Sequence, residues 1–264
     1  MDIQQDLHIH TFRSNCGKPS NTVQAIIETL EKRNILLAGL TDHIDTVEQQ
    51  PRFQTIAAAN RADVSASPSP CRVLVGAEAT MLSPQECALS SEMARRLDFV
   101  IVSCNHYHLA VVEKPKNPTP ANYASHHLAM IRGAAQLGFV TIIAHPFLND
   151  YCDVQLAKQT MKKYKEKELV ETLQQLAKAR VALEINPYRV VNALGWFKDL
   201  VVEGRRHGVK FSLGSDSHML VRVGCPPEPI EDAKGNYTPQ KVCDSIGLSP
   251  EDLIWPFLNP AAVA

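Results

Sequence analysis

The residues of this chain best suited to chemistry are histidines that follow short apolar runs. DLHIH at 6–10 carries two histidines separated by one isoleucine, and LTDH at 40–43 ends on a third. Side chains alternate faces along a strand, so His8 and His10 should point the same way, with Ile9 turned toward a helix layer. Two imidazoles together at a strand end can bind one metal ion, although they can also line a polar interior without one.

Seven of the ten histidines lie at or just beyond the end of an expected strand: His8, His10, His43, His106, His108, His145 and His218. Acids fill the remaining positions, with Glu78, Glu184 and Asp216 near other strand ends. In parallel α/β folds the C-terminal strand ends form one face, where sites are built. Imidazole and carboxylate together bind Zn, Mn or Fe. The eight best ligand candidates suffice for two metals, and for three if a carboxylate bridges.

The elements that must position these residues alternate between strands and helices. The expected strands are Gln4–Ile9, Leu36–Leu40, Arg72–Gly76, Phe99–Ser103, Val140–Ala144, Ala182–Ile185 and Lys210–Leu213. The expected helices are Thr22–Arg33, Ala121–Leu137, Lys165–Arg180 and Val190–His207, with shorter ones near Ile56–Arg61 and Gln85–Arg96. This order predicts an α/β fold with parallel strands. An open doubly wound sheet and a closed barrel both fit, although no GxGxxG follows the first strand.

Composition sets the broad class of the protein. The 264 residues, 45% hydrophobic, are enough for one domain with a large core, followed by a C-terminal extension from about 219 to 264. The net charge of −1 leaves no overall basic field for nucleic acid. No apolar run is long enough to cross a membrane. Seven cysteines without a CxxC pair indicate reduced thiols in a cytoplasmic protein.

Other segments are expected to have no part in the site. The stretches Ser65–Cys71, Lys114–Pro120 and Met219–Thr238 are rich in Pro and are expected to be loops, the last of which could fold over the site. His126, His127 and His207 fall inside expected helices and are taken as ordinary surface or half-buried residues.

Seven short motifs, in this order, resemble those of the polymerase-and-histidinol-phosphatase (PHP) family. They are DLHIHT at 6–11, LTDH at 40–43, GAE at 76–78, NHYH at 105–108, AHP at 144–146, EIN at 184–186 and GSDSH at 214–218. The resemblance implies a distorted seven-stranded (β/α) barrel, similar to a TIM barrel, as a single domain. It also implies two or three divalent metal ions, Zn, Mn or Fe, at the strand C-termini.

The resemblance also implies a ligand set, position by position. The first metal would be held by His8, His10, Glu78 and Asp216. A second would share Glu78 as a bridge and would also be held by His106 and His145. A third would be held by His43 and His218. Many members place a further histidine or acid five or six residues after HxH, where this chain has Asn15 and Cys16. Cys16 could be a thiolate ligand, because a metal deprotonates a thiol. Equally, the third site could be weaker or lost.

The implied activity is hydrolysis of a phosphoester by a metal-bound hydroxide. Two metals can clamp a phosphoryl group, activate a water and offset charge at the leaving oxygen. Asp216 or His108 could handle a proton. Arg13 and Arg189, from their positions at the rim, could bind the phosphate oxygens. Glu184 and Asn186 could orient a ligand, as could the acids of the first two motifs, Asp6 and Asp42.

A small phosphomonoester is the expected substrate: histidinol phosphate, a sugar phosphate or a nucleotide. The alternatives are a stand-alone nuclease acting on short oligonucleotides and a non-catalytic, regulatory metal-binding barrel. The near-neutral charge gives no nucleic-acid footprint, and the near-complete ligand set argues against a non-catalytic barrel. Amidohydrolases also begin with HxH but typically use a lysine on the fourth strand, and residues 99–105 contain none.

Overall fold

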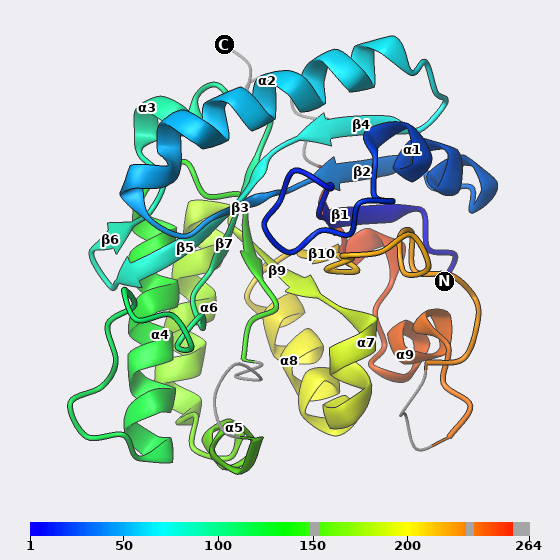
Figure 1. The fold of residues 1–264 in the computed structure, drawn as a ribbon. Helices are drawn as coiled ribbons and strands as arrows, with labels where there is room; N and C mark the ends of the chain where they lie inside the picture. Colours follow the sequence, from blue (N-terminus) through cyan, green and yellow to red (C-terminus); the bar gives the residue numbers. More distant parts are fainter. Residues whose placement is uncertain (148–153, 231–234, 256–264) are drawn as a thin grey trace.

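The strands of the computed structural model, which describes residues 1–147, 154–230 and 235–255, lie side by side inside a layer of helices (Figure 1). In one sheet β1 (Gln5–Ile9) pairs in parallel with β2 (Leu37–Leu40), and β2 with β4 (Arg72–Val75). The second sheet runs in the order β10 (Phe211–Leu213), β9 (Ala182–Ile185), β8 (Ile142–Ala144), β7 (Val100–Ser103), β5 (Ala77–Ser83) and β3 (His43–Ile44).

The two sheets continue into each other and together form a ring. Strand β3 follows β2 after two residues, and β5 follows β4 after Gly76 alone. Only glycine fits there, because a Cβ would lie 2.7 Å from the carbonyl oxygen of Phe99. Beyond the ends of β1 and β10, the His10 amide donates to the Ser217 carbonyl (2.9 Å), and the Ser217 amide donates to the His8 carbonyl (3.3 Å). Loop hydrogen bonds therefore join the last strand to the first, which agrees with a distorted barrel.

All seven predicted strands are confirmed, each to within two residues of its expected ends. The predicted helix Gln85–Arg96 is wrong over its first half. There β6 (Glu86–Cys87) turns back and pairs antiparallel with β5, and only α3 (Ser91–Ala94) is helical. The long continuation of β4 into β5 makes this hairpin possible, and Ser90 then starts α3 by accepting a hydrogen bond from the Met93 amide (3.3 Å).

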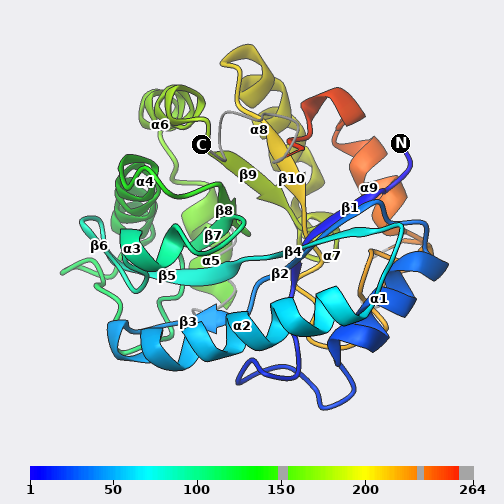
Figure 2. The same ribbon diagram turned by 90° about the horizontal axis from the view of Figure 1, so that it is seen from above.

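Helices cover the outside of the ring, as the view from above shows (Figure 2). They are α1 (Val23–Lys32), α2 (Gln50–Ala66), α4 (Pro120–Gln136), α5 (Val154–Met161), α6 (Glu166–Ala179), α7 (Pro187–Val190), α8 (Leu194–Arg206) and α9 (Pro239–Ser245). Threonines 22, 119 and 238 cap α1, α4 and α9 through their side chains. None of the helices in the described ranges has the length and apolar character needed to cross a bilayer.

Two helices differ from the sequence-based expectation. Helix α2 is much longer than Ile56–Arg61 and enters the predicted loop at 65–71. Its buried residues are only Phe53, Ala57 and Asn60, so its apolar periodicity is faint. The expected helix Val190–His207 is α8 only from Leu194; before it lie the last residue of α7 and a short 3-10 turn. Within the predicted loop 219–238, residues 231–234 lie outside the described part.

Apolar side chains fill the ring below the strand ends. Leu7, Leu74, Ile101 and Ile142 come from four strands around the ring and pack in one cluster. Ile9 instead packs with residues of α1, as its place between two histidines predicted. The described part of the C-terminal extension returns to the barrel, where the Ile254 amide donates to the Phe211 carbonyl (2.7 Å). The site therefore lies at one end of a ring that is otherwise closed by hydrophobic packing.

Candidate metal centre

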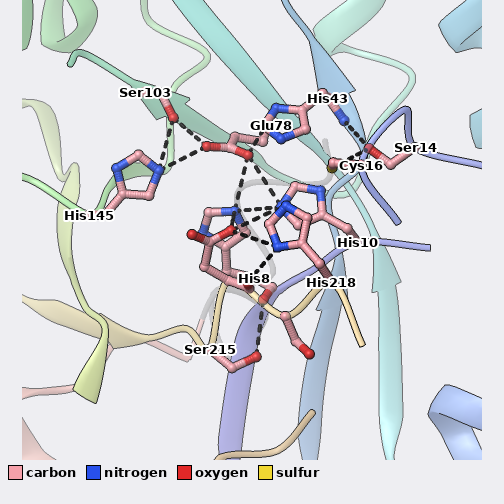
Figure 3. Close-up of polar contacts among 12 residues, drawn as sticks. His8, His10, Ser14, Cys16, His43, Glu78, Ser103, His145, Ser215 and His218 are labelled. Atoms are coloured by element: carbon pink, nitrogen blue, oxygen red, sulfur yellow. Dashed lines mark hydrogen bonds and ion pairs between the residues drawn. The ribbon is translucent and has the colours of Figure 1, made fainter. Parts of the chain in front are cut away.

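Candidate metal ligands from the strand ends meet in three adjoining groups. Figure 3 shows those from His8, His10, Cys16, His43, Glu78, His145 and His218. Within each group one donor atom per residue lies within 4.8 Å of every other. The groups are His8, His10, Glu78 and Asp216; Glu78, His106 and His145; and His10, Cys16, His43 and His218. All nine residues predicted as ligands are therefore brought together. Glu78 and His10 each belong to two groups, so neighbouring groups share a donor residue.

Glu78 lies at the centre of these groups. Its Oε2 is 3.2 Å from His8 Nε2, 3.3 Å from His10 Nε2 and 3.1 Å from His43 Nδ1. The carboxylate is buried, yet Oε2 has the geometry of a hydrogen bond with none of them. A buried carboxylate oxygen without a hydrogen bond is costly, and ring nitrogens directed at the same point suit a cation. The donor set therefore fits divalent metal ions.

The other oxygen of Glu78 faces the second group. Its Oε1 accepts a hydrogen bond from the Ser103 hydroxyl and lies 3.0 Å from His145 Nε2 and 3.5 Å from His106 Nε2. The two oxygens thus face different sets of histidines. One carboxylate that faces two ligand groups is what a metal-bridging role requires.

Asp216 completes the first group from the loop after β10. Its Oδ1 lies 3.2 Å from His10 Nε2, and its Oδ2 accepts a hydrogen bond from Arg189 Nη2 (3.0 Å). Arg189, predicted to bind phosphate, is therefore beside the group. Arg13, predicted for the same role, instead contacts α2 through Asn60 (3.0 Å) and Asp63 (2.8 Å).

The backbone is strained at two of the candidate ligands. His145 has φ of 28° and Asp216 has φ of 52°, in the left-handed region that L-residues rarely adopt. Such a conformation costs on the order of 1–3 kcal/mol and persists only where the surroundings enforce it. At His145, the Asn105 side chain donates to the carbonyl (3.1 Å) and Glu184 accepts from the amide. The strain is consistent with side chains held in place for binding.

Charge balance within the site follows from its burial. Burial opposes ionisation of Glu78, but the charges of His43 and His8 outweigh it and hold the pKa of Glu78 well below its usual range. Burial likewise lowers the pKa of His43, but Glu78 chiefly reverses this and raises it to about 10. His10, for which burial dominates, has a pKa of about 3. The carboxylates thus stay anionic and attract positive charge.

His108, predicted to handle a proton, lies outside these groups. Its ring centroid is 5.3 Å from that of His106, and its side chain is exposed. Partial burial lowers the pKa of His108, while the charge of Asp45 acts to raise it. His108 is thus placed at the open side of the second group, where a proton can be exchanged with solvent.

Glu184, expected to orient a ligand, contacts two of the ligand candidates. Its Oε1 lies 2.7 Å from His8 Nδ1, and its Oε2 accepts a hydrogen bond from the His145 amide. An acceptor at Nδ1 keeps the proton on that nitrogen and leaves Nε2 of His8 free to face Glu78. Glu184 thus fixes one ring and one strained backbone at the same time.

Glu184→Gln is expected to weaken metal binding and lower turnover by about 10- to 100-fold, because an amide cannot accept from both groups. Metal retained after dialysis, measured by elemental analysis, checks the first effect. Glu203→Gln, at an acid on α8 that pairs with His207 (3.0 Å), is the control and should behave as the unaltered protein. Unchanged metal affinity in Glu184→Gln would remove the orienting role.

Sequence reasoning missed a second set of supporting residues, next to His106. The Thr80 hydroxyl donates to Asp45 Oδ1 (2.8 Å) and lies 2.9 Å from His106 Nδ1. Because its one proton is given to Asp45, Thr80 accepts from Nδ1–H of His106 and leaves Nε2 directed at Glu78. The available signal was that Thr80 lies two residues after Glu78 and so shares its face of the strand.

Thr80→Val, which keeps the shape but removes the hydroxyl, is expected to lower metal affinity by about 10-fold or more. Calorimetric titration of the metal-stripped protein measures it. Thr80→Ser keeps the hydroxyl and should bind metal as the unaltered protein does. Equal affinities in the two variants would mean that Thr80 only packs.

The ring of parallel strands and the imidazole–carboxylate groups at its C-terminal ends define a class of protein, the metal-dependent hydrolases built on α/β barrels. A family model described as "PHP domain" matches residues 6–188, and the chain belongs to this family. It is accordingly a hydrolase that acts on phosphoester bonds and depends on metal. Asp216 and His218 lie beyond the matched residues.

The solved structures that share the fold include two phosphatases. One is a histidinol phosphate phosphatase from Lactococcus lactis subsp. lactis Il1403, complexed with zinc, L-histidinol and phosphate. It is 18% identical, with 83% of this chain and 87% of that chain covered and a TM-score of 0.57. The other is a proposed histidinol phosphatase from Listeria monocytogenes, 12% identical, with coverage of 83% and 97% and a TM-score of 0.55. None of the curated proteins compared with the chain matches it.

Proposed function

We propose that this protein hydrolyses a small phosphomonoester with two or three divalent metal ions held at the strand ends. The proposal rests chiefly on the position of Glu78. Its two carboxylate oxygens face separate groups of histidines. A shared carboxylate would hold two metal ions close together, as binding of one phosphoryl group by both of them requires. The zinc, L-histidinol and phosphate bound to the Lactococcus phosphatase support the same class of substrate.

The proposed ligands follow the three groups. The first metal would be held by His8, His10, Glu78 and Asp216, the second by Glu78, His106 and His145, and the third by Cys16, His43 and His218. Zn, Mn and Fe all accept these donors. When bound, such ions supply Lewis acidity to a phosphoryl oxygen and to a water molecule.

Residues of the chain itself complete the reaction. Arg189, whose side chain is 25% exposed, donates to Asp216, and its guanidinium lies beside the group where it can meet the non-reacting phosphate oxygens. The charge of His8 and a hydrogen bond with His10 outweigh burial and hold the pKa of Asp216 well below its usual range, so its carboxylate is ionised and can accept a proton. His108, at the open side, can return one to the leaving alkoxide. Arg13 keeps its predicted role only if phosphate draws it away from Asp63.

The size of the substrate follows from charge. The net charge of −1 provides no basic field to hold a polynucleotide. A small ester whose phosphate is held by metals and Arg189 needs no such field. Histidinol phosphate, sugar phosphates and nucleotides are the proposed candidates, and the proposed location is the cytoplasm, on the basis of cysteine usage.

A substrate panel tests the proposal. Metal-stripped protein is reloaded with Zn or Mn and given histidinol phosphate, sugar phosphates, mononucleotides, cyclic nucleotides and short oligonucleotides. Release of inorganic phosphate from monoesters is the expected result, with no cleavage of diesters. Cleavage of oligonucleotides alone would replace the phosphatase by a nuclease. A fully metal-loaded protein that hydrolyses none of these esters would overturn the proposed substrate class.

A further inference from the structure

Cys16 lies among imidazoles at the edge of the metal centre. Its Sγ is within 4.8 Å of donor atoms of His10, His43 and His218. His10 directs Nε2 at Asp216 (3.2 Å) and so serves the neighbouring group. The Cys16 group is left with one sulfur and two imidazoles of its own, together with the shared His10. Three protein donors with an open fourth position are typical of catalytic zinc sites.

The loop that carries Cys16 is fixed at both ends. At its start, Asp42 accepts hydrogen bonds from the Thr11 amide and hydroxyl (both 2.7 Å). At its end, the Lys18 amide donates to the His218 carbonyl (3.1 Å), which ties this loop to the one that carries His218. Between them, Gly17 packs so closely that a Cβ would lie 1.9 Å from the Thr11 carbonyl oxygen. The sulfur is therefore held beside the imidazoles.

Two buried ring nitrogens in this group have no hydrogen bond. They are Nδ1 of His10 and Nδ1 of His43, each on a largely buried ring. The rings stack, with centroids 4.5 Å apart for His10 and His43 and 4.3 Å for His10 and His218. Stacked imidazoles with buried ring nitrogens that make no hydrogen bond, beside a sulfur 3.3 Å from the Ser14 hydroxyl oxygen, are suited to a shared ligand.

Cys16 also differs from the other described cysteines. Cys87 is half-buried on β6 and lies outside the three donor groups. Cys71, Cys104, Cys225 and Cys243 are buried, and burial raises the pKa of each thiol. Cys16 is exposed and can be reached by a metal ion from solvent.

The donor types separate this group from the other two. The groups around Glu78 offer only imidazole and carboxylate, which suit Zn, Mn and Fe alike. A thiolate is a soft donor that favours Zn and disfavours Mn. Because the donors differ while the groups adjoin, the centre need not hold one kind of metal.

We propose that Cys16, His43 and His218 form a sulfur-containing site that selects Zn over Mn, beside two sites that accept either ion. The inference rests on the proposed function, because it assumes that the two groups around Glu78 are loaded. When Mn is in large excess over Zn, the protein then holds a heterometallic centre, with Zn at the sulfur position and Mn at the other two.

Cobalt(II) tests the site through its colour. Metal-stripped protein is titrated with Co(II), a spectroscopic substitute for Zn, and the near-ultraviolet absorption is recorded. A thiolate-to-cobalt charge-transfer band is expected for the unaltered protein and for Cys87→Ser, whose thiol lies outside the group on β6. The band should be absent in Cys16→Ser and Cys16→Asp. If the unaltered protein binds its full cobalt complement without this band, Cys16 is not a ligand.

Competition between metals tests the selectivity. The stripped protein is equilibrated with one equivalent of Zn and a large excess of Mn, because Zn binds nitrogen and oxygen donors more tightly than Mn. Both metals are then counted by elemental analysis. The unaltered protein is expected to hold one more equivalent of Zn than Cys16→Asp, in which a carboxylate accepts Mn. Equal Zn contents in the two proteins would overturn the proposed selectivity.

The outcomes also separate this inference from the function on which it rests. Protein that turns over phosphomonoesters with full metal but shows neither the band nor the extra Zn overturns the Cys16 site alone. Protein that shows the band but hydrolyses no ester keeps the sulfur site and loses the proposed function.

Discussion

Glu78→Gln is expected to lower phosphomonoester turnover by more than about 100-fold, because residues that merely support a metal ligand already cost about 10- to 100-fold. Glu78 belongs to two donor groups, and its oxygens face His8, His10 and His43 on one side and His145 on the other. The amide keeps the shape but removes the charge and replaces one acceptor by a donor that faces ring nitrogens.

Turnover and metal content should fall together in Glu78→Gln. Elemental analysis after gel filtration is expected to show the loss of at least one equivalent, since both adjoining groups lose a donor. Glu171→Gln, at an exposed position on α6, is the matched control and should match the unaltered protein. Circular dichroism tests whether the variant is folded. A folded Glu78→Gln with full turnover and full metal would show that Glu78 does not bridge the groups.

The parts of the structure that depend on chain-local pattern could be predicted from the sequence. Short apolar runs gave the strands, and parallel strands place their C-terminal ends on one face. His8 and His145 are 137 positions apart, yet their rings stack with centroids 5.7 Å apart. The fold class alone predicts that these histidines lie close together, and no individual contact has to be known for that.

Contacts that depend on the path of a loop or the length of a helix could not be predicted in this way. Arg13 was expected at the rim, but α2 extends far beyond its faint apolar pattern and presents Asn60 and Asp63 to it. Thr80 looked like an ordinary strand residue, because its partner Asp45 comes from the neighbouring strand's loop. Such pairings depend on how distant segments pack in the fold, and the pattern of apolar residues along the sequence does not predict them.

The acids of the first two motifs, Asp6 and Asp42, could be predicted from the sequence only in part. Asp6 and Asp42 were expected to be neighbours that orient ligands. Each of them hydrogen-bonds a loop that carries candidate metal ligands. Asp6 accepts hydrogen bonds from the Ser215 amide (2.8 Å) and hydroxyl (2.7 Å), and from the Gly224 amide (2.7 Å). Burial raises the pKa of Asp6 to about 6. The residue types suggested support, but only the fold shows that the support reaches the loop after β10.

Removal of the metal ions by a chelator is expected to abolish turnover and to lower the thermal unfolding midpoint. Two carboxylates, Glu78 and Asp216, are buried within one group of donors, where anions of like sign repel one another. Divalent ions remove this repulsion and satisfy ring nitrogens that are otherwise without hydrogen bonds. Ligand present at 1,000 times its dissociation constant stabilises the folded state by about 4 kcal/mol, which corresponds to a midpoint shift on the order of 10 °C.

Differential scanning calorimetry with and without chelator measures the shift, and phosphate release measures the activity. Chelator saturated with Zn beforehand is the control and should change neither quantity, because it leaves the bound ions in place. Restoring Zn or Mn should recover both the midpoint and the turnover. If stripped protein retained its turnover, the groups around Glu78 would not be the catalytic centre. If the chelator abolished turnover but left the unfolding midpoint unchanged, the chain's own hydrogen bonds would be sufficient to stabilise the buried carboxylates without metal.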